Sequence, residues 1–204
     1  PSVTHPELYS AEIDALRRDF PACTHGIVLS TKNSLVKDDE QNDIALQMFH
    51  SSKAGYYSDW FNSDEDWKDK FVGCNKNDAS KVFPALMGYN NTKILTMCYE
   101  GMGSTSTCDY VYDYIMAYRK AEAVPSGVTP WYLPSVMCWD QVAKNMSGIN
   151  SSLQKVNGDK MVTSDLPVNN KAAGHYWSST QRSAVNQWTH SMGNGSFHVT
   201  CERA

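Results

Sequence analysis

The sequence predicts an α+β domain with two main helices, a small twisted antiparallel sheet and long ordered loops. Residues 38–52 and residues 106–120 repeat apolar side chains at helical spacing, so each stretch has one face to bury. The dipeptide Asn194-Gly195 indicates a β-hairpin near the C-terminus, because both residues tolerate the positive φ of a type I′ turn. Other segments are rich in Asn, Ser, Tyr and Trp without a sustained period, which is typical of ordered polar loops.

Length and composition indicate one globular domain. A chain of 204 residues with 41% apolar and 20% charged side chains can bury a sizeable core. We expect residues 26–204 to form this domain and residues 1–25 to form a helix or linker element before it. The net charge is -4 and the basic residues are scattered, so nucleic acid is not an expected partner. No apolar run is long enough to cross a bilayer, so membrane contact is expected only through a segment outside this chain.

The cysteines and acidic residues give no sign of a cofactor. The 6 cysteines are widely spaced, without a C-x-x-C pair or paired histidines, so a thiolate metal site is not expected. Three disulfides would fit a secreted protein, but Cys98, Cys138 and Cys201 occupy positions typical of small core residues, and we expect mostly free, buried thiols. The acidic residues at 64–66 form no Ca²⁺ motif near the C-terminus, which leaves a structural Ca²⁺ ion as an unsupported alternative.

In the N-terminal half, the expected elements follow from local patterns. Residues 10–20 predict a short helix whose N-cap is Ser10. Residues 26–30 predict a buried strand, and residues 38–52, with acidic side chains in their first turn, predict a main helix that packs on it. Residues 56–90 show no period, so irregular structure is expected there.

In the C-terminal half, residues 91–100 predict a short helix and residues 106–120 the second main helix. A linker and an extended stretch then lead into a helix capped by Ser135, whose inward side chains are Trp139, Val142, Ala143 and Met146. Residues 147–174 predict loops with one weak strand pair.

A two-residue turn at Asn194-Gly195 sets the expected register of the final hairpin. It pairs Met192 with Phe197 and His190 with Val199. Alternation then places a core group on one face, comprising Trp188, His190, Met192, Phe197, Val199 and Cys201. The opposite face is polar and is a candidate contact surface, with a merely solvated face as the alternative; it carries Gln187, Thr189, Ser191, His198, Thr200 and Glu202.

Two sequence blocks carry a family resemblance: Trp131-Tyr-Leu-Pro-Ser135 before a helix, and Tyr176-Trp-Ser-Ser-Thr180 before a polar loop, followed by Trp188 and Gly195. In combination they resemble the C-type-lectin-like domains of bacterial surface proteins, including the variable proteins of diversity-generating retroelements. The resemblance runs from Gly26 to the end of the chain. It implies a C-type-lectin-like fold in which residues 176–202 form a variable region that contacts ligand.

The resemblance implies roles for two sets of residues. Framework positions are Trp131, Leu133, Pro134, Tyr176, Trp177, Ser178, Ser179, Thr180, Trp188 and Gly195. Ligand-contacting positions, in the loop 181–186 and the hairpin 187–202, are Gln181, Arg182, Ser183, Val185, Gln187, Thr189, Ser191, His198 and Thr200. The implied function is an adhesin or receptor-binding module on a bacterial cell surface, or alternatively on a phage particle. Its partner would be a surface protein or glycan of another cell.

Catalysis is not expected. Ser178, Ser179 and Thr180 lack a G-x-S-x-G elbow and a local acid and base, so we expect their hydroxyls to hydrogen-bond the backbone. Formylglycine-generating oxidases share a related fold, but Cys201, near the corresponding region, has no assigned partner thiol. Such an oxidase, another enzyme on the same fold, and a structural tip subunit of a pilus or phage tail are the alternatives to binding.

Overall fold

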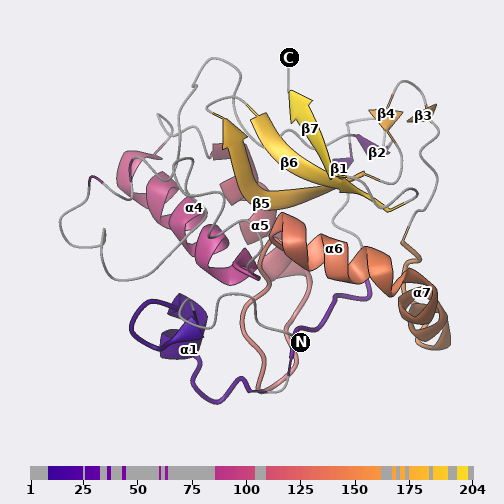
Figure 1. The fold of residues 1–204 in the computed structure, drawn as a ribbon, viewed down its shortest axis with the longest axis horizontal. Helices are drawn as coiled ribbons and strands as arrows, with labels where there is room; N and C mark the ends of the chain where they lie inside the picture. Colours follow the sequence, from indigo (N-terminus) through magenta and orange to yellow (C-terminus); the bar gives the residue numbers. More distant parts are fainter. Residues whose placement is uncertain are drawn as a thin grey trace.

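A computed structural model describes residues 9–24, 26–32, 36–37, 43–44, 60, 63, 86–103, 109–161, 167–168, 171–172, 175–183, 186–192 and 197–201. The main sheet has three antiparallel strands, β5 (His175–Ser183), β6 (Asn186–Ser191) and β7 (Phe197–Cys201), in the order β5-β6-β7. Figure 1 shows this sheet beside the helices, with the C-terminus just beyond β7. The combination of helices with small antiparallel sheets confirms the α+β prediction.

Three helices support the sheet or the core beneath it. The helices α4 (Gly88–Met102) and α5 (Asp109–Ala121) confirm those predicted over residues 91–100 and 106–120. The helix α6 (Val136–Lys144) begins where expected, because the Ser135 hydroxyl caps it by accepting a hydrogen bond from the Cys138 N–H at 3.4 Å. Helix α4 packs on β5, and α6 packs on both β5 and β6. The sheet is therefore held by elements from the middle of the chain.

The helix α7 (Met146–Lys155) corrects the prediction of loops over residues 147–174. Gly148 and several serines give this stretch a weak helical propensity, so the local pattern is uninformative. Met146, Ile149 and Leu153 nevertheless pack in a cluster with Met161 and Met192, and tertiary packing stabilises the helix. The weak strand pair expected in this stretch is confirmed, since β3 (Pro167–Val168) pairs with β4 (Lys171–Ala172).

The N-terminal predictions need three corrections. The helix α1 (Ala15–Asp19) is capped by the Asp14 carboxylate, which accepts a hydrogen bond from the Leu16 N–H at 3.0 Å, and not by Ser10. Residues 26–30 form no strand. Ile27 and Val28 are 47% and 55% exposed, whereas Leu29 of the same segment packs on a buried cluster.

The helix predicted over residues 38–52 is wrong at β2 (Asp43–Ile44), and the rest of that stretch lies outside the described residues. Strand β2 pairs with β1 (Val36–Lys37) in a short antiparallel hairpin, with Val36 opposite Ile44. Both of these residues are β-branched, and such residues favour extended backbone over helix.

The principal buried cluster combines α4 and α5 with α1. It contains Ala15, Ile94, Leu95, Cys98, Val111 and Ile115. Cys98 and Cys138 are buried thiols outside any disulfide, as expected, whereas the thiol of Cys23 is half-buried. Burial raises the pKa of the Cys138 thiol, so this side chain is a packing group rather than a reactive thiolate. The side chains of Cys74, Cys108 and Cys201 lie outside the described residues.

Polar contacts hold α1 to α4. The Asp19 carboxylate accepts a hydrogen bond from the Tyr89 hydroxyl at 3.0 Å and forms an ion pair with Lys93. The Leu16 N–H also donates to Asn90 Oδ1 at 3.4 Å. Partial burial raises the pKa of Asp19, but the hydrogen bonds from Lys93 and Tyr89 and the positive charge of Lys93 outweigh it, and the net shift is downward. The ionised carboxylate therefore stabilises the folded chain.

Asp19→Asn should lower the free energy of unfolding at pH 7 by under about 1 kcal/mol, because the Lys93 ion pair is partly solvent-exposed. The pKa of Asp19 in the folded chain lies below its usual value of 3.8, so the advantage of the parent should persist above that pH and disappear as the pH falls through the lowered pKa. Urea unfolding of the parent and of Asp19→Asn, at pH 7 and at a pH below the lowered pKa of Asp19, measures this, with Glu12→Gln as the control for net charge. An equal stability difference at the two pH values would contradict a stabilising role for the ionised Asp19 carboxylate.

Candidate functional site

The two sequence blocks that carry the family resemblance meet directly in space. The Ser179 N–H donates to the Pro134 carbonyl oxygen at 2.8 Å, and the Val136 N–H donates to Thr180 Oγ1 at 3.1 Å. Val136 opens α6, where backbone N–H groups have no partner within the helix. Strand β5 therefore supplies the acceptor that the start of α6 needs, and we name these contacts the β5–α6 junction.

The hydroxyl side chains of Ser178, Ser179 and Thr180, consecutive residues of β5, serve the backbone and the core. Ser178 Oγ donates to the Trp188 carbonyl oxygen at 2.7 Å and accepts from the Thr180 N–H at 3.1 Å. Asn91 Nδ2 of α4 donates to Ser179 Oγ at 3.4 Å. All three hydroxyl residues are buried. The interpretation of these hydroxyls as backbone hydrogen-bonding groups is confirmed for Ser178 and Thr180.

Further contacts tie the other framework residues to the same region. The Trp139 indole N–H donates to the Trp177 carbonyl oxygen at 2.7 Å, and the Leu133 N–H donates to Thr92 Oγ1 at 3.0 Å. The Trp131 indole N–H donates to the Glu122 carbonyl oxygen at 2.9 Å. Six of the framework residues are half-buried, namely Trp131, Leu133, Pro134, Tyr176, Trp177 and Trp188. Gly195 lies outside the described residues.

Gly88 allows α4 to approach this region closely. A Cβ atom at this position would lie 2.8 Å from Tyr132 Cε2 and 2.9 Å from the backbone nitrogen of Ser135. Because real Cβ contacts are not that short, the first residue of α4 has to lack a side chain unless the chain at 132–135 moves.

The register of the final hairpin differs from the prediction by two residues. His190 pairs with Phe197, and Trp188 pairs with Val199. A two-residue turn at Asn194-Gly195 would instead place Met192 opposite Phe197. The prediction of that turn register is wrong. A shift of two residues preserves side-chain parity, so the division of the hairpin into two faces is unchanged.

The expected loop after Thr180 is also shorter than predicted. Strand β5 continues to Ser183, which pairs with Asn186, and irregularities interrupt the pairing on either side of Gln181. Residues 181–183 therefore belong to a strand rather than to a loop. A bulged strand re-aims its side chains, a change that a simple alternation pattern does not reveal.

Three proposed contact residues are buried and cannot present an exposed face. Gln181 is 6% exposed, Thr189 is 2% exposed and Ser191 is 0% exposed. His190 and Met192, which alternate with them, are buried as well, so this end of β6 is covered on both faces. The prediction of a solvated polar face is wrong here. Other proposed contact positions have side chains outside the described residues, namely Arg182, Ser183, Val185, Gln187, His198 and Thr200.

The sequence did not indicate a buried charged group beside His190. His190 is 0% exposed, and its Nε2 atom lies 3.8 Å from Asp140 Oδ1. The other Asp140 oxygen accepts hydrogen bonds from Lys144 Nζ at 2.6 Å and Gln141 Nε2 at 3.2 Å. His190 is thus a core histidine facing a carboxylate on α6. The sequence pattern that could have indicated this buried carboxylate is the position of Asp140 between the inward residues Trp139 and Val142 of the predicted helix.

Sequence reasoning also missed the buried polar start of α4. Asn90, Asn91 and Thr92 are each at most 1% exposed. Asn91 lies on the same face of the helix as Leu95, at a spacing of four residues, and that position was the available signal.

In the described part of the chain, no group of three His, Cys, Asp or Glu side chains is placed to hold a metal ion. Among the helices described, none has the length and apolar character that a membrane span requires.

No family model matches the chain. It is 27% identical over 192 residues to the "Putative fimbrium tip subunit Fim1C" of Bacteroides ovatus, an alignment that covers 92% of this chain and 33% of that protein. A crystal structure of a fimbrial protein from Bacteroides ovatus is similar, with a TM-score of 0.66 and 25% identity over 95% of this chain and 35% of the other. The chain therefore spans about a third of the length of the proteins it matches.

Thr180→Val should lower the free energy of unfolding by about 1–3 kcal/mol, because it keeps the side-chain shape but removes the acceptor of a buried N–H group. Thr180→Ser keeps the hydroxyl and should cost less. Ser151→Ala removes an exposed hydroxyl on α7 and should change stability by under about 0.5 kcal/mol. Urea unfolding ranks the three variants, and parental stability of Thr180→Val would show that the β5–α6 junction does not anchor the sheet.

Proposed function

We propose that this chain is a ligand-recognition domain of a fimbrial tip subunit on a bacterial surface. The observation that carries the proposal is the match to a fimbrium tip subunit over 92% of the chain, joined by a fimbrial protein of similar structure. This supports the pilus-tip alternative of the sequence analysis more strongly than a free-standing receptor-binding module. Because the chain spans about a third of those proteins, the proposal concerns one part of such a subunit.

Recognition is proposed to use the connection between β5 and β6 together with β7. Burial removes Gln181, Thr189 and Ser191 from the direct contact surface. Six of the ligand-contacting positions that the family resemblance implies remain as proposed contacts: Arg182, Ser183, Val185, Gln187, His198 and Thr200. Arg182 and Ser183 end β5, Gln187 is near the start of β6, and His198 and Thr200 lie on β7, while Val185 lies in the connection between β5 and β6. Binding residues are commonly found where a rigid scaffold ends. The partner is a protein or glycan of another cell, and a C-type-lectin-like, diversified binding segment remains part of this proposal.

We propose binding without catalysis. Both similar proteins are fimbrial, which supports a role other than catalysis for this chain. The buried hydroxyls of Ser178 and Thr180 serve the backbone, which supports a structural role for the residues that most resemble nucleophiles. The oxidase alternative would require turnover of a cysteine-containing peptide with copper that Cys201→Ser abolishes.

Immunogold electron microscopy tests the fimbrial location. Antibodies against the purified chain should label the ends of fimbriae on the bacterium that encodes it, and a strain without the gene should not be labelled. Labelling along whole fimbriae would indicate a shaft subunit, and labelling confined to the cell interior would contradict the proposal.

Arg182→Ala, Gln187→Ala and His198→Ala test the contact surface. Each should unfold within about 0.5 kcal/mol of the parent, because surface truncations rarely change stability by more. At least one should weaken binding to a ligand found by glycan-array or surface-protein screening by about tenfold or more, as expected for an interface with few dominant residues. Lys155→Ala, at an exposed position of α7, is the matched control. Parental affinity of all three variants would place the contact surface elsewhere.

A further inference from the structure

Arg119, in the last turn of α5, has a guanidinium group that the chain uses only in part. Its Nε donates to the Trp131 carbonyl oxygen at 2.7 Å, and its Nη1 lies 4.0 Å from Met116 Sδ, a weak acceptor. In the part of the chain that the structure describes, no carboxylate forms an ion pair with it. A guanidinium carries five N–H donors in a planar fork, so donors remain for an external acceptor.

The charge of Arg119 is balanced only in part among the described residues, because the Glu100 carboxylate of α4 favours its charged form without forming an ion pair with it. The side chain is half-buried, and burial lowers the pKa of Arg119 from its usual value, although the guanidinium stays charged at neutral pH. On α4, the charge of Lys93 is matched by Asp19. A carboxylate from outside the chain could form an ion pair with Arg119, as the Asp19 carboxylate does with Lys93.

Tyrosine rings share the outer surface of these two helices. Tyr99 of α4 and Tyr112 of α5 stack with ring centroids 4.1 Å apart and an angle of 17° between planes, and both are half-buried. Tyr89 and Tyr112 lie close enough to Arg119 to influence its pKa. We define the α4–α5 surface by Tyr89, Tyr99, Tyr112, Met116 and Arg119.

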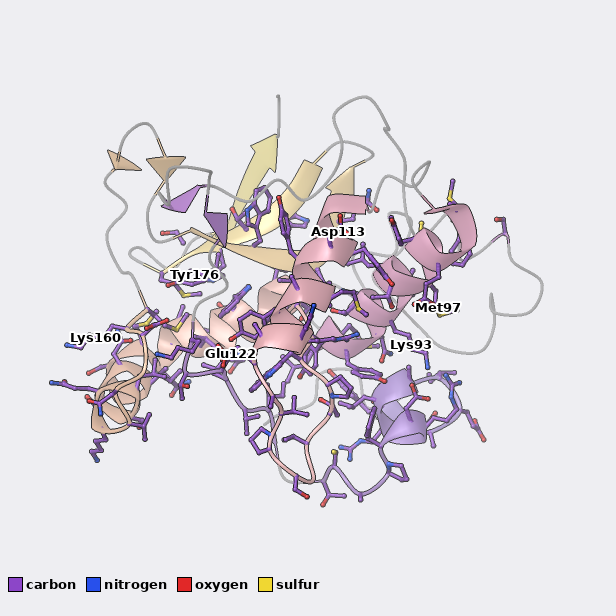
Figure 2. The ribbon with its side chains drawn as sticks, turned by 180° about the vertical axis from the view of Figure 1, so that it is seen from behind. Lys93, Met97, Asp113, Glu122, Lys160 and Tyr176 are labelled. Carbon is purple, nitrogen blue, oxygen red and sulfur yellow. The ribbon has the colours of Figure 1, made fainter. Side chains whose placement is uncertain are left out.

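Figure 2 shows α5 in front of the sheet, with α4 beside it. Lys93 and Met97 project from α4 and Asp113 from α5 in this view. Met116 is 40% exposed, so part of the α4–α5 surface is open to solvent.

We propose that the α4–α5 surface binds a carboxylate-bearing sugar, such as a uronic acid or sialic acid residue of a glycan, with Arg119 holding the carboxylate. A sugar acid combines a planar carboxylate, which matches the guanidinium fork, with an apolar ring face that can lie on tyrosine. A neutral sugar would leave Arg119 without a carboxylate in direct contact, and an acidic peptide need not bring a ring face to the tyrosines. This proposal does not depend on the fimbrial assignment or on the β5–β6 connection.

Titration calorimetry of the full chain with two pairs of probes tests the proposal. Trigalacturonate should bind and its methyl ester should not, or sialyllactose should bind and lactose should not, which also distinguishes the two kinds of sugar acid. Arg119→Gln should weaken binding of the acidic probe by about tenfold or more, as expected for loss of a charge-assisted hydrogen bond. Lys120→Gln, an exposed neighbour on α5 with the same change in charge, should bind as the parent does.

A second variant separates binding from folding, because Arg119 also holds the Trp131 carbonyl. Arg119→Lys keeps the charge but loses the planar fork, and it should fold and bind more weakly than the parent. Equal losses in Arg119→Gln and Lys120→Gln, or no preference for either acid over its neutral partner, would overturn the proposal. Equal binding of an Asp-rich hexapeptide would overturn the assignment to a sugar.

Discussion

The fold depends on the β5–α6 junction, where the backbone of Ser179 bonds Pro134 and the Thr180 hydroxyl takes up the first N–H of α6. The same short run of β5 reaches α4 through Asn91 and β6 through the carbonyl oxygen of Trp188. Because the hydroxyl residues are buried, each lost hydrogen bond would leave a polar group with no access to water. One polar network therefore positions two helices and two strands at once, and it leaves little freedom for variation at its own residues.

This network separates the scaffold from the surfaces proposed for recognition. The buried end of β6 carries Thr189, His190 and Ser191, and substitution there would act on the scaffold before it acted on a partner. The proposed contact residues, such as Gln187 and His198, lie on the same strands but are not among the residues of this hydrogen-bond network. A domain that is rigid in its interior can change its ligand contacts at strand ends without reorganising its core, which is the arrangement expected of a recognition module.

The two proposed contact regions differ in their physical basis. The β5–β6 connection and β7 were singled out by pattern and resemblance, whereas the α4–α5 surface follows from a half-buried guanidinium and stacked tyrosines that the folded chain brings together. Two weak sites on one domain can act together on a repetitive surface such as a glycan layer, because engagement of one site raises the effective concentration at the other. A fimbrial tip would present both to the same target.

The sequence by itself determined the α+β class, the helices over residues 91–100 and 106–120, the Ser135 cap and the grouping of Trp188 with His190, because these rest on local periodicity and local hydrogen bonding. It did not determine α7, whose helix forms through Leu153 and Ile149 packing on distant residues. It also placed Thr189 and Ser191 on a solvated face, since alternation reports which side chains share a face and not whether that face is covered. The meeting of Pro134 with Ser179, and of Tyr99 with Tyr112, was decided only by tertiary structure, because contacts between segments that pack together in the fold leave no period in the chain.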